Sequence, residues 1–288
     1  MSDPQAHPDL PANIGVLGGG RMGAGIAHAF LMKGSRVVII ERDEASAQAA
    51  RDRVSSSVRQ SLERGAEGHP DTLMSHFSTV IESSTLDTCE LVIEALPENM
   101  HLKVEALQKV EKHLTTRAVL ATNTSSLSVS DLAGHLARPQ NFIGLHFFNP
   151  VPASTLIEVI TGDKTAEDLV PTARTWVQAL GKTAIVVKDA PGFASSRLGV
   201  ALALEAMRMV EEGVAEPHDI DTAMILGYKH PTGPLRTTDV VGLDVRLGIA
   251  EYLHEQLGDR FAPPQILRDK VARGELGRKT GKGFFDWS

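Results

Sequence analysis

The stretch that decides the fold is residues 13–41, which read NIGVLGGGRMGAGIAHAFLMKGSRVVIIE. Its apolar start, residues 14–17, predicts a short buried strand. The strand leads into Gly18, Gly20 and Gly23, which occupy the three glycine positions of the pattern G-x-G-x-x-G. The first glycine allows a tight turn, the second lets bare backbone approach a pyrophosphate, and the third lets the next helix pack closely on the sheet. We therefore predict a dinucleotide-binding turn, in which Arg21 and Met22 also contact the cofactor.

The elements that follow the glycines support this prediction. Residues 22–33 are expected to form a helix that ends at Gly34, and residues 36–40 a second strand. Glu41 ends this strand, close to the spacing of about 20 residues after the glycines at which a carboxylate accepts a ribose 2′-hydroxyl. Arg42 favours NADP instead, because an arginine at this place can bind the 2′-phosphate of that cofactor. The acid occupies the motif position itself, so we expect NAD as the cofactor.

Composition restricts the possible partners and the compartment. A chain of 288 residues is long for one core, so one larger and one smaller domain are expected. The net charge of −7, without a basic stripe, argues against nucleic acid. The single cysteine, Cys89, excludes an internal disulfide and fits a reducing compartment. No apolar run approaches the roughly 18 residues of a membrane span, and residues 1–12 are polar and interrupted by proline, unlike a signal peptide. We expect a cytoplasmic protein without a membrane partner.

The rest of the chain predicts an α/β fold with a Rossmann-type, doubly wound, mostly parallel sheet, followed by a smaller all-α domain. Further strands are expected at 91–95, 119–121, 142–147, 156–160 and 184–187. Helical segments are expected at 44–65, 101–113, 131–136 and 165–180, the first as one long helix or a helix pair. The last opens with a capping box at residues 165–168. The helix at 44–65 carries arginines that either form a solvated face or contact an anionic ligand: Arg51, Arg53, Arg59 and Arg64.

From residue 189 onward the pattern is helical, with helices expected at 198–212, 220–226, 244–256 and 264–273 and a basic, glycine-rich loop at 277–283. The boundaries are therefore 1–188 for the NAD-binding domain and 189–288 for a helical domain. The helix at 198–212 is apolar on all sides, so it is either buried or paired with another subunit.

One pair of residues is suited to proton transfer. His146 ends one predicted strand and Glu158 lies within the next. An imidazole titrates near neutral pH, and a carboxylate behind it fixes its tautomer and stabilises the imidazolium. By themselves, however, these two residues are better explained as a satisfied core histidine and a structural ion pair. No third ligand stands at a recognised spacing, so we predict no metal site.

Several motifs in order change this balance. Residues 18–27, Asn123-Thr124-Ser125-Ser126, His146 to Pro152, Glu158-Val159-Ile160, Pro191-Gly192-Phe193 and residues 277–284 together resemble the L-3-hydroxyacyl-CoA dehydrogenase family, including its 3-hydroxybutyryl-CoA dehydrogenases. The resemblance covers almost the whole chain. It implies NAD-dependent interconversion of an L-3-hydroxyacyl-CoA and its 3-ketoacyl-CoA, an acyl-CoA thioester as the substrate, and a homodimer formed through the helical domain.

The resemblance also implies roles for individual residues. His146 would be the general base, Glu158 would orient it, and Ser125 would hydrogen-bond the reacting oxygen of the substrate. Further contacts to the cofactor are implied for Asn123, Glu98, Lys103, Asn149 and Lys279, and Lys103 is also implied near the substrate. Ser57 and Arg64 fall where the family contacts CoA.

Three positions depart from the family pattern. Ser196 stands where the family has a catalytic asparagine, and Ser154 and Thr232 replace two methionines near the acyl site. The resulting small hydroxyl side chains favour either a short acyl chain, as in 3-hydroxybutyryl-CoA, or an ω-carboxylated one, as in 3-hydroxyadipyl-CoA. Two alternatives remain open: an NAD-dependent dehydrogenase of a free hydroxy acid or sugar acid, and a dinucleotide-binding protein without catalysis.

Overall fold

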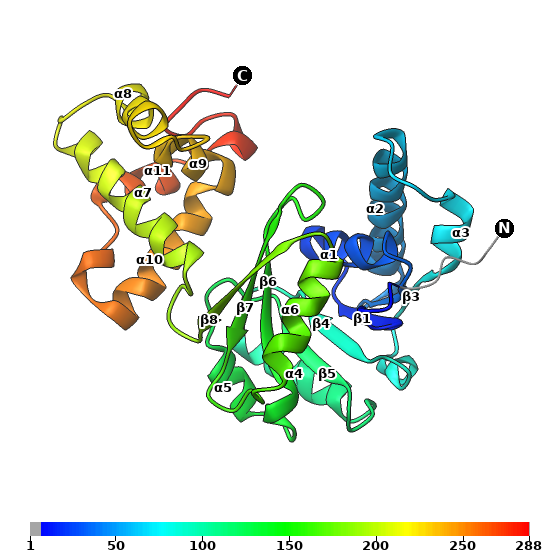
Figure 1. The fold of residues 1–288 in the computed structure, drawn as a ribbon. Coiled ribbons are helices and arrows are strands. Elements are labelled where there is room, and N and C mark those ends of the chain that lie inside the picture. Colours follow the sequence, from blue (N-terminus) through cyan, green and yellow to red (C-terminus); the bar gives the residue numbers. More distant parts are fainter. Residues whose placement is uncertain (1–6, 288) are drawn as a thin grey trace. The chain divides into compact units, whose positions relative to one another are not determined.

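A computed structural model describes residues 7–287 of the chain (Figure 1). Residues 1–6 of the predicted leader lie outside this range. The chain divides into two compact units, Met1–Asp189 and Ala190–Ser288. Within the described range, no helix combines the length and apolar character that crossing a membrane requires.

The first unit is built on one sheet of eight strands. They are β1 (Asn13–Leu17), β2 (Arg36–Ile40), β3 (Phe77–Val80), β4 (Leu91–Glu94), β5 (Val119–Thr122), β6 (Phe142–Phe147), β7 (Leu156–Thr161) and β8 (Thr183–Lys188). The order across the sheet is β3-β2-β1-β4-β5-β6-β7-β8. All neighbours are parallel except β6 and β7, which pair antiparallel. The first six strands follow the order of a Rossmann sheet, which confirms the predicted fold class.

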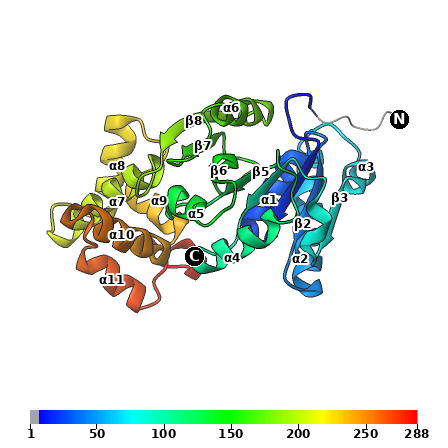
Figure 2. The same ribbon diagram turned by 90° about the horizontal axis from the view of Figure 1, so that it is seen from below.

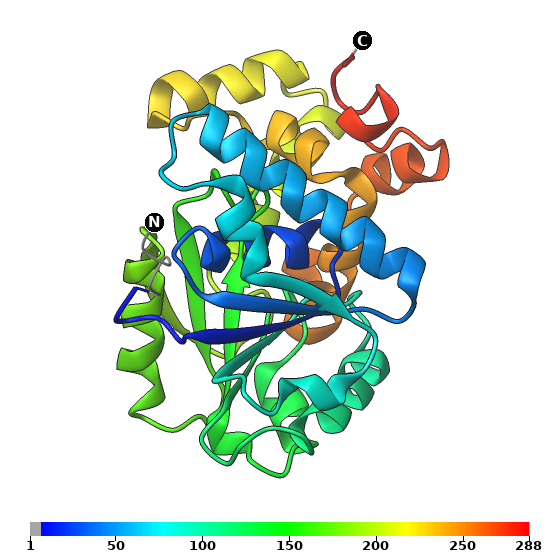
Figure 3. The same ribbon diagram turned by 90° about the vertical axis from the view of Figure 1, so that its right-hand side faces the viewer.

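Helices cover both faces of this sheet (Figures 2 and 3). One face is covered by α1 (Arg21–Leu31), α2 (Glu44–Glu63) and α6 (Leu169–Ala179), whose apolar side chains share one core with the strands. The other face is covered by α4 (Met100–Glu111) and α5 (Val129–Gly134). Short turns of 3₁₀-helix occur at Ser83–Leu86 (η1) and Pro139–Asn141 (η2). Because β4 is covered on both sides, all four of its residues are buried.

Two elements of this unit escape prediction from the sequence. A short helix, α3 (Pro70–Ser75), begins with proline at its N-terminus and leads into the edge strand β3. Within β3 only Phe77 is fully buried, since the strand lies at the edge of the sheet and has a neighbour on one side only. Its sequence, FSTV, therefore carries neither a continuous apolar run nor a clear alternation.

The predicted capping box at residues 165–168 is wrong. The helix α6 begins at Leu169, and Asp168 before it has helical dihedral angles and no side-chain capping bond. The hydroxyl of Thr165 instead accepts a hydrogen bond from the Gly162 amide (3.0 Å) and donates one to the Phe142 carbonyl (2.8 Å). The threonine serves the turn after β7 because a hydroxyl can satisfy loop backbone groups as well as helix termini.

The second unit is helical. It contains α7 (Ser195–Glu211), α8 (Pro217–Thr222), a π-helical turn at Ala223–Gly227 (η3), α9 (Pro234–Val241), α10 (Leu243–Leu257), a 3₁₀ turn at Asp259–Phe261 (η4), α11 (Gln265–Ala272) and a 3₁₀ turn at Arg278–Thr280 (η5). Its core joins α7, α9, α10 and α11 through side chains that include Met207, Leu235, Leu253 and Leu267. The sequence does not predict the helix α9, since it has only eight residues and two of those on its buried face, Thr238 and Asp239, are polar.

A buried carboxylate organises the segment after α11. Asp239 of α9 is 1% exposed and accepts hydrogen bonds from the backbone amides of Phe284 and Phe285 (both 2.9 Å) and from the indole of Trp287 (2.8 Å). The Arg236 guanidinium lies over the rings of Phe285 and Trp287, at 4.4 and 5.1 Å from their centroids. These contacts hold the segment after α11 against α9.

We expect Asp239→Ala to lower the free energy of unfolding by about 2 to 4 kcal/mol, because three donors lose a charged acceptor. Urea denaturation measures the loss, and faster hydrogen exchange at Phe284 and Phe285 locates it. Asp286→Ala is the matched control, since Asp286 is exposed and lies between the same partners. Equal stabilities of the two variants would contradict the prediction.

Candidate functional site

A cavity of about 1050 Å³ opens at the carboxyl ends of β1 and β4. These adjacent strands lead to opposite halves of the sheet, and the crevice at such a switch point is where doubly wound folds bind their ligands. The cavity is lined by residues from the glycine turn and from the ends of β2 and β4, including Gly18, Gly20, Arg21, Met22, Glu41, Arg42, Ala95 and Pro97. The predicted cofactor residues between positions 18 and 41 are thus brought together, apart from Gly23, which lies behind them.

The three glycines of the motif differ in what a side chain would meet at each position. Gly18 has φ of +90°, which side chains disfavour. A Cβ atom at Gly23 would lie 1.8 Å from the Gly18 carbonyl oxygen, so α1 packs against the turn only because Gly23 has no side chain. At Gly20 a Cβ atom would have no neighbour within 4 Å. The protein itself has room for a side chain there, so packing within the protein does not require this glycine.

Glu41 is part of the same turn. Its Oε1 accepts a hydrogen bond from the Gly19 amide at 2.6 Å, which fixes the carboxylate at the mouth of the cavity. Arg53 of α2 donates from Nη1 to the Gly19 carbonyl at 3.1 Å and also lines the cavity. From the sequence, Arg53 is one of four helix arginines that either form a solvated face or contact an anionic ligand. Its contact with the glycine turn is visible only in the structure.

The predicted acid–base pair is formed. His146 and Glu158 are directly opposed residues of the antiparallel strands β6 and β7. His146 Nδ1 lies 2.7 Å from Glu158 Oε2, and the two residues are 6% and 0% exposed. The ring of Phe148 lies beside the imidazole, 4.4 Å between centroids. An ionised carboxylate can only accept a hydrogen bond, so beside an ionised Glu158 it is Nδ1 that carries the proton of this contact.

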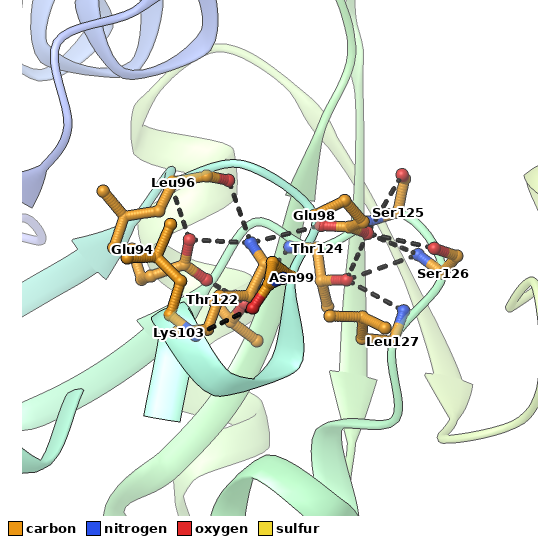
Figure 4. Close-up of polar contacts among 11 residues, drawn as sticks. Glu94, Leu96, Glu98, Asn99, Lys103, Thr122, Thr124, Ser125, Ser126 and Leu127 are labelled. Carbon is orange, nitrogen blue, oxygen red and sulfur yellow. Dashed lines mark hydrogen bonds and ion pairs between the residues drawn. The ribbon is translucent and has the colours of Figure 1, made fainter. Parts of the chain in front are cut away.

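The loop after β5 is bonded on one side to β6 and on the other to the segment between β4 and α4. Asn123 Oδ1 accepts from the backbone amide of Phe147 at 2.8 Å, next to His146. On the other side, Glu98 Oε1 accepts from the Thr124 hydroxyl (2.5 Å) and from the amides of Ser125 (2.8 Å) and Ser126 (3.0 Å), as Figure 4 shows. Two predicted cofactor residues, Asn123 and Glu98, therefore hold the loop that carries Ser125.

Electrostatics favour the ionised form of Glu98. Burial raises the pKa of this carboxyl, but the Lys103 ammonium and the hydrogen bonds from Thr124 and Ser125 outweigh it. The pKa of Glu98 therefore lies below its ordinary value, and the carboxylate accepts the loop donors at neutral pH.

Lys103 is buried beneath this loop, and its predicted contacts with cofactor and substrate stay predictions. It is 1% exposed, and its Nζ lies 2.7 Å from Glu94 Oε1, 3.1 Å from the Leu96 carbonyl and 3.2 Å from Glu98 Oε2 (Figure 4). An ammonium group has three donors, and these three acceptors use all of them. The buried Glu94 in this group is absent from the sequence prediction, although an acid that ends an apolar strand is a signal for it.

The other predicted residues are spread over both units. Asn149 is exposed and follows β6 at a cis peptide bond to Pro150. Ser57 lies on α2, and Arg64 ends that helix. Ser196, in the first turn of α7, and Lys279, in η5, belong to the second unit. There the Lys279 ammonium pairs with both carboxylate oxygens of Asp244, at 2.6 and 2.7 Å.

Comparison with known proteins identifies the family. Residues 13–190 match the family model described as 3-hydroxyacyl-CoA dehydrogenase, NAD binding domain, and residues 192–287 match the C-terminal domain of the same family. The chain belongs to the 3-hydroxyacyl-CoA dehydrogenase family. It is 38% identical to a probable 3-hydroxybutyryl-CoA dehydrogenase of Deinococcus radiodurans over 95% of this chain and 99% of the relative. It is 37% identical to the mitochondrial hydroxyacyl-coenzyme A dehydrogenase of Rattus norvegicus, over 96% and 92% of the two chains.

A solved structure of this family has the same fold. The crystal structure of (S)-3-hydroxybutyryl-CoA dehydrogenase from Ralstonia eutropha superposes with a TM-score of 0.92 at 35% sequence identity, covering 97% of this chain and all of that one. The family match establishes an NAD-binding domain in residues 13–190, which contains the cavity described above.

The glycine geometry gives a prediction for this cavity. Gly20 has φ of −62°, and an added methyl group would have no protein neighbour. For Gly20→Ala we therefore expect near-normal stability but at least tenfold weaker NADH binding, a loss of about 1.4 kcal/mol in binding free energy. Gly23→Ala meets the Gly18 carbonyl, so we expect a loss of about 1 to 3 kcal/mol in stability. NADH fluorescence titration and urea denaturation of both variants separate the two effects. Normal NADH affinity in Gly20→Ala would show that the ligand does not approach this glycine.

Proposed function

We propose that this chain is an NAD-dependent dehydrogenase that interconverts an L-3-hydroxyacyl-CoA and its 3-ketoacyl-CoA. The observation that carries the proposal is the 2.7 Å contact between His146 Nδ1 and Glu158 Oε2, on strands whose ends are tied to the Ser125 loop. The family membership supports the reaction class. The proposal includes a homodimer and a cytoplasmic location. Large exposed apolar side chains of the second unit support the dimer, among them Leu198 and Leu226, 72% and 65% exposed.

In the proposed mechanism the two buried side chains move one proton. Glu158 accepts a hydrogen bond from Nδ1–H, so this proton stays on Nδ1 and Nε2 is unprotonated. Nε2 removes the proton of the substrate hydroxyl, and the carboxylate stabilises the imidazolium that forms. Ser125 orients the reacting oxygen. NAD, when bound, supplies the acceptor for the hydride that leaves C3. In the reverse direction the imidazolium returns the proton to the oxygen.

The cofactor residues support a preference for NAD over NADP. Gly18, Gly20 and the N-terminus of α1 are suited to the pyrophosphate, and Glu41 to a ribose 2′-hydroxyl. Oε1 of Glu41 accepts from the Gly19 amide at 2.6 Å and Oε2 from the Arg42 amide at 3.3 Å, which orients the carboxylate, and its negative charge would repel a 2′-phosphate. Arg42, which favours the opposite preference, is 85% exposed in its side chain and its Nε pairs with Asp43 at 3.1 Å.

For the acyl chain we propose a short or ω-carboxylated substrate, such as 3-hydroxybutyryl-CoA or 3-hydroxyadipyl-CoA. The support is the set of hydroxyl side chains at Ser154, Thr232 and Ser196. Thr232 Oγ1 bonds the Thr237 hydroxyl at 2.8 Å, so of these residues it is the most fully engaged within the protein. The Ser154 hydroxyl makes long contacts of 3.4 Å to the backbone of Leu156.

The general base gives a direct test. We expect His146→Gln to reduce turnover by about 10² to 10⁴-fold, because the amide cannot take the hydroxyl proton. NADH affinity should change little. Glu158→Gln should also lower the rate, since the imidazolium loses its counter-charge. Near-normal turnover in His146→Gln, with intact folding confirmed by circular dichroism, would overturn the assignment of the base.

A substrate panel tests the reaction itself. We expect oxidation of NADH, more efficiently than NADPH, with acetoacetyl-CoA and with 3-ketoadipyl-CoA, measured as kcat/KM by the absorbance of the reduced cofactor. The free 3-keto acids are the control, because the proposal requires the CoA moiety. Equal activity on the free acids would favour a hydroxy-acid dehydrogenase, and cofactor binding without any turnover would favour a non-catalytic binding protein.

A further inference from the structure

A buried ionic group lies beneath the Ser125 loop and has no part in the proton transfer described above. Glu94, the last residue of β4, is 0% exposed. Its Oε1 accepts from the Lys103 ammonium (2.7 Å) and from the Leu96 amide (2.5 Å), and its Oε2 accepts from the Thr122 hydroxyl (2.6 Å). A buried charge is costly unless every lone pair is used in this way, and an apolar group of the same shape would avoid the cost.

Lys103 transmits the position of Glu94 to Glu98. The acceptors of its ammonium group are Glu94 Oε1, the Leu96 carbonyl and Glu98 Oε2, so no donor remains to point elsewhere. Because Lys103 extends from α4 into the sheet, Glu94 determines where the ammonium group lies. The ammonium group in turn holds Oε2 of Glu98 at 3.2 Å.

Glu98 uses its two oxygens in different directions. Oε2 faces Lys103, while Oε1 receives the donors of Thr124, Ser125 and Ser126 (Figure 4). The loop is thus connected to Glu94 twice, once directly through Thr122 and once through Lys103 and Glu98. At its far side, Asn123 bonds the Phe147 amide next to His146. Both connections from Glu94 therefore lead to the loop that places Ser125 relative to the imidazole.

We propose that Glu94 is a positioning residue, which acts through Lys103, Glu98 and Thr122 to fix Ser125 against the reacting oxygen. This inference rests on the proposed dehydrogenase function. Glu94 does not touch the substrate or the cofactor. A misplacement of about 1 Å in such a supporting residue can reduce a rate by about 10²-fold, so the effect belongs to turnover rather than to cofactor binding.

The test is Glu94→Gln, which preserves shape and removes the charge. We expect kcat for acetoacetyl-CoA reduction to fall by about 10 to 100-fold, with the Kd of NADH changed less than about twofold. Glu90→Gln is the matched control, because it makes the same change at the exposed opposite end of β4 and should leave kcat unaltered.

A double-variant cycle with Ser125→Ala distinguishes positioning from general stability. If Glu94 acts through Ser125, Glu94→Gln should cost little more in the Ser125→Ala background, whereas independent effects multiply. Rate losses that multiply in the double variant, which means additive activation free energies, would overturn the inference. A normal kcat in Glu94→Gln would do the same. Should Glu94→Gln fail to fold, Thr122→Val removes one connection without a change of charge, and it should lower kcat several-fold with the same non-additivity.

The same measurements separate this inference from the function on which it rests. No turnover of 3-ketoacyl-CoA by the unmodified protein would overturn both. An active protein whose Glu94→Gln and Thr122→Val variants are normal, or additive with Ser125→Ala, would overturn the positioning role alone.

Discussion

The close approach of α1 to the end of β1 is the constraint on which the first unit depends. A Cβ atom at Gly23 would stand 1.8 Å from the Gly18 carbonyl, so the helix and the turn are in contact without any side chain between them. This approach directs the N-terminus of α1, with its free amides and partial positive charge, toward the cavity between β1 and β4. Gly20 then faces the open side, and Glu41 reaches back to the Gly19 amide.

Two pairs of neighbouring strands each place a buried carboxylate opposite a polar side chain. The antiparallel pairing of β6 and β7 sets His146 opposite Glu158, and the parallel ends of β4 and β5 bring Glu94 next to Thr122. In each pair a buried carboxylate accepts from a side chain of the next strand. The two carboxylates have different partners: Glu158 faces the imidazole of His146, and Glu94 faces the hydroxyl of Thr122, after which the Ser125 loop begins.

Elements with a strong local signal could be predicted from the sequence. The bounds of β2 and β6 agree with the apolar runs that predict them, and the glycine turn follows from residue spacing alone. The pairing of His146 with Glu158 was predicted as chemistry, but the register that brings them together depends on hydrogen bonds between strands. The edge strand β3 and the helix α9 were missed because tertiary contacts rather than periodicity stabilise them. The surroundings of Lys103 show the same limit, since burial of a lysine by two acids depends on contacts across three elements.

The reversal of direction at β7 makes residues 148–155 the connection between two paired strands. Hydrogen bonds along β6 and β7 fix the register of His146 and Glu158, whereas the segment between these strands, residues 148–155, is held by other bonds, from the Lys182 ammonium to the carbonyls of Val151 and Ser154. Val151 of this segment is buried in the core beside Gly25 of α1, and the ring of Phe148 lies against the imidazole of His146. An inserted or deleted residue between β6 and β7 would therefore displace these contacts even if the strand register were kept. The tolerance of the buried pair to mutation thus depends on its connection as well as on the hydrogen bonds between the strands.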